Sequence, residues 1–290
     1  MTKVYVSSVI DAPAADVWRV VRDFNALPDW TPFAVGPKNE CGTPGTNRFS
    51  VGDASVVEGD SGAPRNVRIP VSISNPSASD ISVDYIVDEG SASATDDIDT
   101  KIGVTRTLEF KPNANGIMPT TKNVTVKVRP DTAVEDDETI TVTLSNPTGG
   151  YTVGRKTGTG TIIDDDGDST VQAVAISGSS SCEGDSSAKG SNAGYQVSLR
   201  NPAAGDTELT VVVSDGTATG GVDYKAVPKP KKVKFKAGQV QKRVNVTVLP
   251  DLVLEQNENI GASIDTSPLP VLSGAGSADV WIINDDAAGV

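Results

Sequence analysis

The sequence predicts a mainly all-β protein, with two tandem β-sandwiches preceded by a short N-terminal β-α segment. From residue 49 onward, short runs of alternating apolar and polar residues recur, which is the pattern of half-buried strands. Turn-forming residues separate these runs, and the chain holds 28 Gly and 18 Pro. The motifs of the first half return in the same order in the second half, which indicates a duplicated domain.

The N-terminal residues 1–36 differ from everything that follows. Val4 to Ile10 reads as a strand, and Ala14 to Leu27 carries apolar residues at helical spacing after an Asp-Ala-Pro start. The turn-rich residues 37–47 are expected to be a linker. We then expect one sandwich over 48–167, a short linker at 168–170 and a second sandwich over 171–287.

Each sandwich is expected to hold about seven strands, because a repeat of a little over a hundred residues with this pattern has the size of an immunoglobulin-like sandwich. The clearest strand signals in the first copy are Val67–Ile73, Ile81–Val87, Val124–Val128, Thr139–Leu144 and Gly158–Ile163. The cysteine-tryptophan-cysteine spacing of true immunoglobulin domains is missing.

The internal repeat is the strongest signal in the sequence. The Glu-Gly-Asp motif at Glu58 returns at Glu183, and the Asn-Pro turn at Asn75 returns at Asn201. Further pairs follow in the same order: Gly90–Asp97 with Gly216–Asp223, Val128–Asp131 with Val248–Asp251, Glu135–Glu138 with Glu255–Glu258, and Ile162–Asp166 with Ile282–Asp286. The offset between the copies drifts only slightly, so both copies are expected to share one fold.

The charge balance narrows the range of partners. The chain has 25 basic and 38 acidic residues, a net charge of −13, which repels nucleic acid and anionic membranes. It contains no histidine, which removes the Ser-His and Cys-His catalytic pairs and most zinc sites. We therefore expect no enzyme, no nucleic-acid partner and no membrane insertion. Neither a membrane-spanning apolar run nor a secretory signal peptide is recognisable in this sequence.

The two cysteines, Cys41 and Cys182, are too few for a disulfide scaffold and lie far apart in the sequence. We expect unpaired thiols, with a bridge left as the alternative.

The acidic residues of each copy stand at matching strand ends. They are a Glu in Glu-Gly-Asp, an Asp that ends a Gly-Ser/Thr-Ala run, an Asp after Pro, a Glu-x-x-Glu and a terminal acidic triplet. Taken singly, each is an ordinary solvated turn residue. Their recurrence in one order favours convergence at one tip of each sandwich, where loops gather. Such a tip offers the six to eight oxygen ligands that Ca²⁺ takes.

These motifs together resemble the Calx-beta domain, over about 48–167 and 170–287. The residues that carry the resemblance are Val-Val-Glu-Gly-Asp, Gly-Thr-Ala-Thr-Gly-Gly-Val-Asp-Tyr, Pro-Asp-x-x-x-Glu-x-x-Glu and Ile-Ile-Asp-Asp-Asp. The resemblance implies a seven-stranded immunoglobulin-like sandwich with Ca²⁺ at one tip. It implies as ligands in the first copy Glu58, Asp97, Asp131, Glu135, Glu138, Asp164, Asp165 and Asp166. In the second copy it implies Glu183, Asp223, Asp251, Glu255, Glu258, Asp285 and Asp286.

The second copy is expected to bind Ca²⁺ more weakly. Asn284 stands where the first copy has Asp164, and Gln256 and Asn257 replace two further acids. Fewer charged ligands lower the affinity for Ca²⁺.

Residues 1–36 resemble the opening strand and helix of the polyketide cyclase/START-like fold of the Bet v 1 type. Only the start of such a domain is recognisable, so we transfer no ligand binding from it. Residues 1–36 are then a remnant of a fusion, an assembly error, or a functional segment whose strand and helix dock on the first sandwich or pair with a neighbouring chain.

Three functions compete on this basis. The leading one is a Ca²⁺-dependent extracellular or cell-surface protein, structural or adhesive, in which Ca²⁺ stiffens the joint between the sandwiches. Calcium ions are then its first partners, with other protein chains or cell-surface components as further ones. The second is a hydrophobic small-molecule carrier built on the N-terminal segment. The third is a metal-independent structural subunit of a surface polymer.

Overall fold

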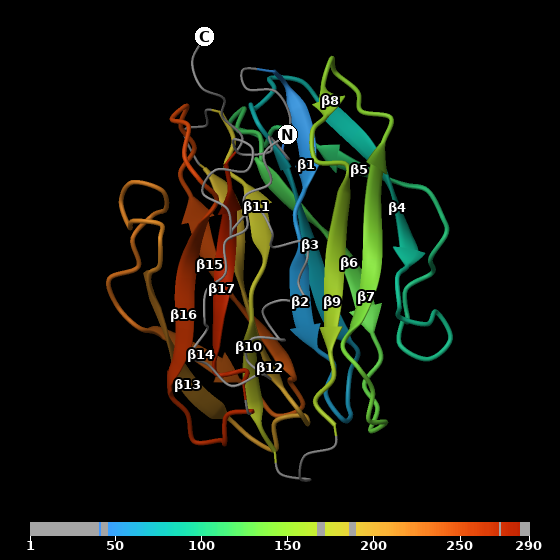
Figure 1. Ribbon diagram of the computed structural model, residues 1–290, viewed down its shortest axis with the longest axis vertical. Helices are drawn as coiled ribbons and strands as arrows, with labels where there is room; N and C mark the ends of the chain where they lie inside the picture. The colour runs from blue at the N-terminus through green and yellow to red at the C-terminus, as the bar shows by residue number, and fades with distance from the viewer. Residues whose placement is uncertain (1–40, 42–45, 167–171, 186–189, 273, 285–290) are drawn as a thin grey trace, which may run out of the picture. The chain divides into compact units, whose positions relative to one another are not determined.

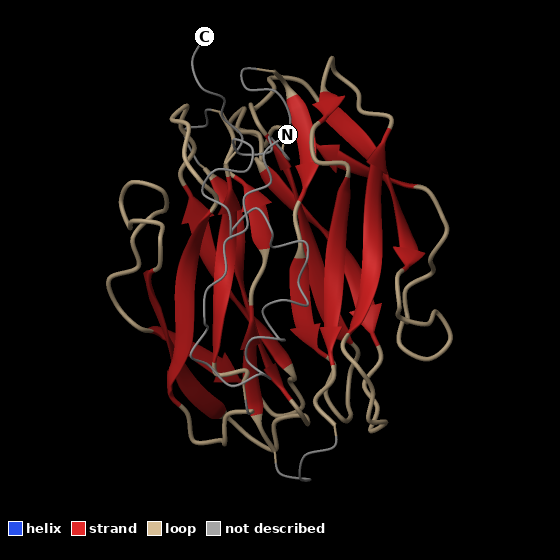
Figure 2. Ribbon diagram, in the orientation of Figure 1, coloured by secondary structure: helices blue, strands red, loops and turns tan. Residues whose placement is uncertain are grey.

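The computed structural model describes residues 41, 46–166, 172–185, 190–272 and 274–284. The chain divides into two compact units, Met1–Lys38 and Asn39–Val290, and every described residue belongs to the second. The strand and helix predicted within residues 1–36 therefore lie outside the described residues. In the described part every regular element is a β-strand, as Figure 2 shows, so the predicted all-β fold is confirmed.

The first sandwich consists of two facing sheets (Figure 1). One has the strand order β6-β3-β1-β8 and the other the order β2-β9-β7-β4-β5. The strands are β1 (Arg48–Val51), β2 (Ala54–Val57), β3 (Arg65–Ile73), β4 (Ile81–Glu89), β5 (Arg106–Phe110), β6 (Thr121–Val128), β7 (Glu138–Ser145), β8 (Thr152–Val153) and β9 (Thr157–Ile163). The five strand signals of the sequence coincide with β3, β4, β6, β7 and β9 within a few residues at each end.

The second sandwich repeats this plan, with sheet orders β10-β12-β15 and β11-β17-β16-β13-β14. Its strands are β10 (Val174–Ser177), β11 (Ser180–Cys182), β12 (Ser191–Leu199), β13 (Thr207–Asp215), β14 (Lys231–Phe235), β15 (Gln241–Val248), β16 (Glu258–Thr266) and β17 (Ser277–Ile283). Because β10–β17 occupy the same sheet positions as β1–β7 and β9, the repeat seen in the sequence is a repeat of structure.

Alternation along the strands builds each core. In β7, Ile140, Val142 and Leu144 are buried, while the residues between them are half-buried. Phe49 of β1 meets Phe110 of β5 across the two sheets, with ring centroids 5.5 Å apart. Each sandwich has its own cluster of buried apolar residues, from Phe49 to Ile162 in the first and from Val174 to Ile282 in the second.

The first strand of each sandwich changes sheet halfway along its length. β1 pairs antiparallel with β3, whereas β2 pairs parallel with the last strand, β9. The second sandwich does the same, since β10 pairs with β12 and β11 pairs parallel with β17. The Glu-Gly-Asp motif directly follows β2 in one copy and β11 in the other, so this crossover brings each motif beside the end of the last strand.

The two sandwiches contact each other through these crossovers. Ser55 N donates to Gly178 O at 3.1 Å, and Ser180 N donates to Asp53 O at 2.8 Å. Ala54 and Ser179 form an antiparallel bridge, so β2 and β11 run in opposite directions (Figure 1). The Glu-Gly-Asp tips of the two sandwiches therefore point to opposite ends of this pair.

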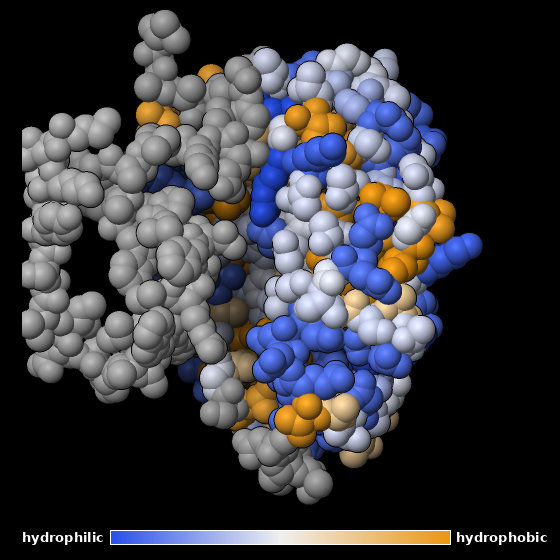
Figure 3. All heavy atoms as spheres, turned by 45° about the vertical axis from the view of Figure 1, so that its right-hand side comes forward, coloured by the Kyte–Doolittle hydropathy of each residue, from blue (hydrophilic) through white to orange (hydrophobic). Residues whose placement is uncertain are grey.

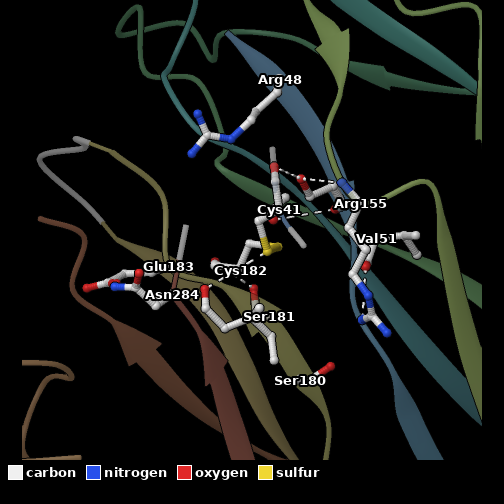
Figure 4. Close-up of a disulfide and its surroundings, with 12 residues drawn as sticks. Cys41, Arg48, Val51, Arg155, Ser180, Ser181, Cys182, Glu183 and Asn284 are labelled. Carbon is white, nitrogen blue, oxygen red and sulfur yellow. Dashed lines mark hydrogen bonds between the residues drawn. A yellow bond between two sulfur atoms is a disulfide. The ribbon is translucent and has the colours of Figure 1, made fainter. Parts of the chain in front are cut away.

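The expectation of unpaired thiols was wrong, because Cys41 and Cys182 form a disulfide (Figure 4). Their Cα atoms lie 6.0 Å apart across a sequence separation of 141. Cys41 precedes β1, where Ser50 Oγ donates to its carbonyl oxygen, and Cys182 ends β11. The bond could not be predicted from the sequence, because the two cysteines are far apart in the chain and only the packing of β11 beside the start of the first sandwich brings them together.

On the face drawn in Figure 3, apolar residues form small patches separated by hydrophilic ones. Within the described residues, the structure contains no helix that could span a bilayer.

Candidate metal centres

Acidic side chains converge at the tip of the first sandwich, where three connections meet the end of β2. Oxygens of Glu58, Asp131 and Glu135 lie within 4.8 Å of one another, and so do oxygens of Glu58, Asp164 and Asp166. Asp97, Glu135 and Glu138 form a third group at the same spacing. Since Glu58 and Glu135 each belong to two groups, seven of the eight ligands predicted for this sandwich form one continuous carboxylate cluster.

Glu58 is the buried centre of this cluster, with 2% of its surface exposed. Its backbone N–H donates to Ile163 O at 3.2 Å, which fixes it beside the end of β9. Its Oε1 is buried and has no hydrogen-bond partner among the described residues. A buried carboxylate oxygen without a donor is costly unless a cation or a proton satisfies it.

The neighbouring acids raise the cost of ionising Glu58. Burial, followed by the negative charges of Asp131 and Asp164, raises the pKa of Glu58 from 4.5 to about 9. Burial and nearby acids also raise the pKa of Asp166 to about 6 and the pKa of Glu138 to about 7. A divalent cation at this tip would reverse these shifts, because it favours the ionised carboxylates.

The ligand loops are held by their own backbone. Ser93 N donates to Asp97 Oδ2 at 2.6 Å, and Asp97 N donates back to Ser93 O at 3.0 Å, closing a tight turn before the site. Asp131 Oδ1 accepts from Ala133 N at 2.8 Å, and Asp164 Oδ2 accepts from Glu135 N at 3.3 Å. Asp164 Oδ1 also accepts from Asp166 N at 3.1 Å, so these bonds limit how far the loops spread.

The tip of the second sandwich repeats this arrangement. Oxygens of Glu183, Asp251 and Glu255 lie within 4.8 Å of one another, as do oxygens of Asp223, Glu255 and Glu258. Thr219 N donates to Asp223 Oδ2 at 2.7 Å, which is the counterpart of the Ser93–Asp97 turn. Asp223 is 4% exposed, and its Oδ1 is buried with no hydrogen-bond partner in the described part of the chain.

Electrostatics at the second tip follow the same pattern. Burial, followed by the charges of Asp223 and Glu255, raises the pKa of Glu258 to about 7. Burial is also the main cause of the raised pKa of Glu255.

The second tip differs from the first at Asn284. Its amide Nδ2 lies 3.4 Å from Glu183 Oε2 (Figure 4). At the equivalent place the first copy has the carboxylate of Asp164 beside Glu58. An amide lowers the negative charge of the cluster, which agrees with a weaker second site. The predicted ligands Asp285 and Asp286 lie outside the described residues.

Asp165 occupies a different position from the other predicted ligands of the first sandwich. Its Oδ1 accepts from Gly59 N at 2.8 Å, and its Oδ2 accepts from Arg200 Nε of the second sandwich at 3.1 Å. Both oxygens are thus occupied, and Asp165 is in none of the carboxylate groups of the described residues. Its role as a ligand stays a prediction, which this geometry does not favour.

The residues that the sequence did not reveal are those that join the sandwiches. Arg200 also pairs with Asp60 at 3.1 Å, and Arg48 pairs with Asp185 at 2.5 Å. Asp60 and Asp185 are the last residues of the two Glu-Gly-Asp motifs. An arginine of each sandwich therefore pairs with the motif of the other sandwich. The repeat could have pointed to both aspartates, but Arg48 and Arg200 do not occupy equivalent positions of the repeat.

The donor set suits a hard cation. Every group consists of carboxylate oxygens, and the chain has no histidine to supply a nitrogen ligand. Ca²⁺ accepts irregular oxygen sites of this kind, whereas Mg²⁺ demands octahedral geometry and Zn²⁺ prefers nitrogen or sulfur. The buried oxygens of Glu58 and Asp223 fit a bound Ca²⁺.

Comparison with known families found two matches. Residues 188–286 match the family model of the Calx-beta domain. Residues 1–135 match the family model described as polyketide cyclase/dehydrase and lipid transport. That second match reaches beyond the predicted 1–36 into β1–β6, and the part of it that the structure describes belongs to the first sandwich.

The comparison with solved structures found several domains of Calx proteins among its matches. The crystal structure of CBD12 from CALX1.2 is 19% identical, with 81% of this chain and 99% of that chain covered and a TM-score of 0.34. The apo-form Calx CBD1 domain is 27% identical, with 42% and 99% covered and a TM-score of 0.33. CBD12 of CALX1.1 is 19% identical, with 80% and 99% covered and a TM-score of 0.33. These scores are too low to carry an argument about function. No curated protein matches the chain.

Proposed function

We propose that this chain is a Ca²⁺-binding structural or adhesive repeat protein of the cell exterior, which holds Ca²⁺ at the tips of its two sandwiches and catalyses no reaction. The match of residues 188–286 to the Calx-beta family model supports the assignment of the second sandwich. The internal repeat extends it to the first sandwich, where the carboxylate cluster is larger.

The observation that carries the proposal is the environment of Glu58. A 2%-exposed carboxylate with an unsatisfied oxygen, surrounded by Asp131, Glu135, Asp164 and Asp166, would destabilise a protein that had no cation for it. The second sandwich also holds a buried carboxylate oxygen without a hydrogen-bond partner among the described residues, Oδ1 of Asp223, at the position equivalent to Asp97. A bound cation at each tip explains why both tips keep such a costly oxygen.

In this proposal, Ca²⁺ at the first tip also stiffens the joint between the sandwiches. Asp164 and Asp166 share a carboxylate group with Glu58, and Asp165 between them pairs with Arg200 of the second sandwich. A cation that fixes Asp164 and Asp166 therefore restrains the residue to which the second sandwich is anchored. The linker that follows is short, so this restraint acts directly on the joint.

The cell exterior is supported by the disulfide and by the ion itself. Disulfides persist in oxidising compartments and are rare in the reducing cytosol. Extracellular modules commonly bind Ca²⁺ with modest affinity, because the ion is abundant outside cells. An adhesive role needs rigid, repeated sandwiches, which Ca²⁺ at the tips would provide.

Thermal unfolding with and without millimolar Ca²⁺, after exhaustive chelation, tests the proposal. Because Ca²⁺ binds only the folded tips, it is expected to raise the unfolding midpoint by mass action. In the Glu58→Gln variant the rise should be smaller, because most of the contribution of the first sandwich should be lost. The matched control is Asp80→Asn, because the Asp80 side chain is 65% exposed and lies between β3 and β4, outside the carboxylate cluster.

If the unfolding midpoint of the unsubstituted protein is the same with and without Ca²⁺, the proposal is refuted. The acids would then be solvated turn residues, and the chain would be a metal-independent structural protein.

A further inference from the structure

Large exposed apolar side chains in the described part of the chain gather around the proposed Ca²⁺ ligands. Five of the seven lie within two residues of a ligand: Val134, Val222, Leu252, Val253 and Leu254. The other two are Val271 and Trp281. Since exposed apolar side chains that cluster on a surface mark sites of interaction, this distribution indicates that the tips take part in an interface.

The second tip presents the larger apolar group. Leu252, Val253 and Leu254 connect the ligands Asp251 and Glu255, and they are 65%, 56% and 39% exposed. No strand includes them, and Val222, 58% exposed, directly precedes the ligand Asp223 on another loop. The apolar residues thus lie on the same loops as the ligands, and a bound cation would hold those loops in place.

The first tip has the same plan with a different charge. Val134, 71% exposed, stands between the ligands Asp131 and Glu135. Asp136 follows as an exposed acid that belongs to none of the carboxylate groups of the described residues. The corresponding residue of the second tip is Gln256, which is neutral. The two tips are therefore alike in their apolar centre and unlike in charge.

The two tips face opposite ends of the sandwich pair. Glu58 follows β2 and Glu183 follows β11, and the bridge between Ala54 and Ser179 is antiparallel. One copy can therefore use both tips at once, each toward a different neighbour.

We propose that copies of this chain associate head to tail, the Ca²⁺-loaded second tip of one copy docking on the first tip of the next. The proposal rests on Ca²⁺ binding as the function of the tips. Without the cation the two acidic clusters repel each other, and with it the repulsion is removed. The contact buries Leu252 and Leu254 against Val134.

The coordination number of Ca²⁺ explains why a second tip would join a first tip and not another second tip. Ca²⁺ takes six to eight oxygens, and each carboxylate group of the second tip offers three side chains. Asp136 of the next copy supplies a further carboxylate to that ion. Two second tips facing each other lack this acid, because both carry Gln256. A contact between unlike surfaces does not close on itself, so it extends into linear chains of copies.

The two sheet edges formed by β14 and β5 are poorer sites for association. The edge strand β14 carries Lys231, Lys232 and Lys234, and charged side chains on an edge strand oppose pairing with another chain. The edge strand β5 carries Arg106 and Glu109.

Sedimentation velocity of the full chain over a concentration series tests the proposal. A contact made of loop tips is smaller than a standard interface of about 1,600 Å², so we expect weak association. In millimolar Ca²⁺ the sedimentation coefficient should rise with concentration, and in chelator it should stay that of a monomer. Leu252→Ser with Leu254→Ser should abolish the rise, and the matched control Val271→Ser should keep it.

A mixing experiment tests the direction of the contact. A first-tip variant, Val134→Ser with Asp136→Asn, and the second-tip variant should each stay monomeric alone in Ca²⁺. Mixed together they should form a complex of two chains, because each retains one intact and complementary tip. If the first-tip variant dimerises by itself, the contact joins two second tips and the head-to-tail proposal is overturned.

The Ca²⁺-induced rise of the unfolding midpoint separates this proposal from the proposed function. If that rise persists while the protein is monomeric at every concentration, Ca²⁺ binding stands and self-association is refuted. Co-sedimentation of monomeric protein with phosphatidylcholine vesicles in Ca²⁺, lost in the second-tip variant, would likewise overturn self-association and assign the apolar loop to a lipid surface.

Discussion

At the scale of single residues, the most informative group is the carboxylate of Glu58. Its position after β2 makes it a turn residue in the sequence, yet the structure buries it at the meeting point of three acidic connections. Burial and the surrounding acids act in the same direction on its ionisation, so the metal-free tip favours a protonated Glu58.

The stability of the chelated protein is expected to fall as the pH rises from about 5 to about 9. The pKa of Glu58 is raised from 4.5 to about 9 in the folded state, so across this window the folded protein holds a proton that the unfolded chain releases. The unfolded state then binds fewer protons, which makes the slope of unfolding free energy against pH negative. Thermal midpoints measured in chelator at successive pH values check this.

Ca²⁺ should remove this loss, because the bound ion stabilises the ionised carboxylates. The difference between midpoints with and without Ca²⁺ should therefore widen as the pH rises, and Glu58→Gln should flatten the chelated profile. A chelated midpoint that is independent of pH in the unsubstituted protein would contradict the assigned environment of Glu58.

At the scale of elements, the crossover between β1 and β2 has the greatest structural consequence. A Cβ on Gly52 would fall on the carbonyl oxygen of Ser180 in the second sandwich and lie 2.9 Å from Pro70 Cγ. Gly52 therefore allows the backbones of the two sandwiches to approach closely. At the equivalent crossover, a Cβ on Gly178 would fall on Asp279 O, so both crossovers depend on the missing side chain.

Gly52→Ala is expected to destabilise the protein by about 1–3 kcal/mol, because the added methyl forces the two backbones apart. Chemical denaturation measures the change in unfolding free energy. Gly205→Ala is the matched control, since nothing lies within 4 Å of its Cβ position, and it should change the stability little. Equal stability of the two variants would show that the crossover tolerates a side chain.

At the scale of the whole second unit, reciprocal ion pairs and one disulfide join the sandwiches. Arg200 is 4% exposed and reaches Asp60 and Asp165, and Arg48 is 1% exposed and reaches Asp185. Arg65 adds hydrogen bonds to Leu199 O at 2.8 Å and Arg200 O at 2.9 Å. Buried pairs like these cost desolvation, but they fix one geometry, because removing either partner leaves a buried charge alone.

Arg200→Gln is expected to loosen the joint, at a cost of about 3–5 kcal/mol, because it leaves the buried carboxylate of Asp165 without its cation. Small-angle scattering in chelator should then give a larger radius of gyration than the unsubstituted protein. Arg106→Gln is the control, because Arg106 bonds to Lys101 O within its own sandwich.

For the unsubstituted protein, scattering should give a narrower range of conformations with Ca²⁺ than with chelator. Superimposable profiles would refute the stiffened joint while leaving Ca²⁺ binding intact.

Replacing both cysteines, Cys41→Ser with Cys182→Ser, is expected to lower the unfolding free energy by about 3–5 kcal/mol. The bond closes a long loop, with a sequence separation of 141, and such a constraint acts mainly on the unfolded chain. Denaturation with and without reductant measures the effect, and reduction of the unsubstituted protein should reproduce the double variant. Two free thiols by mass spectrometry in the oxidised, folded protein would contradict the pairing.

The strands and the sandwich repeat could be predicted from the sequence, because alternation and turn residues are local signals. The alternating burial of Ile140, Val142 and Leu144 could be read directly from their spacing. The gathering of Glu58, Asp131 and Asp164 at one tip was also predictable, because strand ends meet at the ends of a sandwich and the repeat marked the same acids twice.

Only the tertiary structure decided how the two sandwiches meet. The pairing of Cys41 with Cys182, and the pairing of Arg200 with Asp165, join residues whose local sequences carry no sign of each other. Such contacts depend on the antiparallel packing of β2 against the β10–β11 crossover, which the close backbone approach at Gly52 allows. The periodicity of the sequence indicates which face of a strand is buried. The partner of a buried charge or thiol depends instead on how the two whole domains pack against each other.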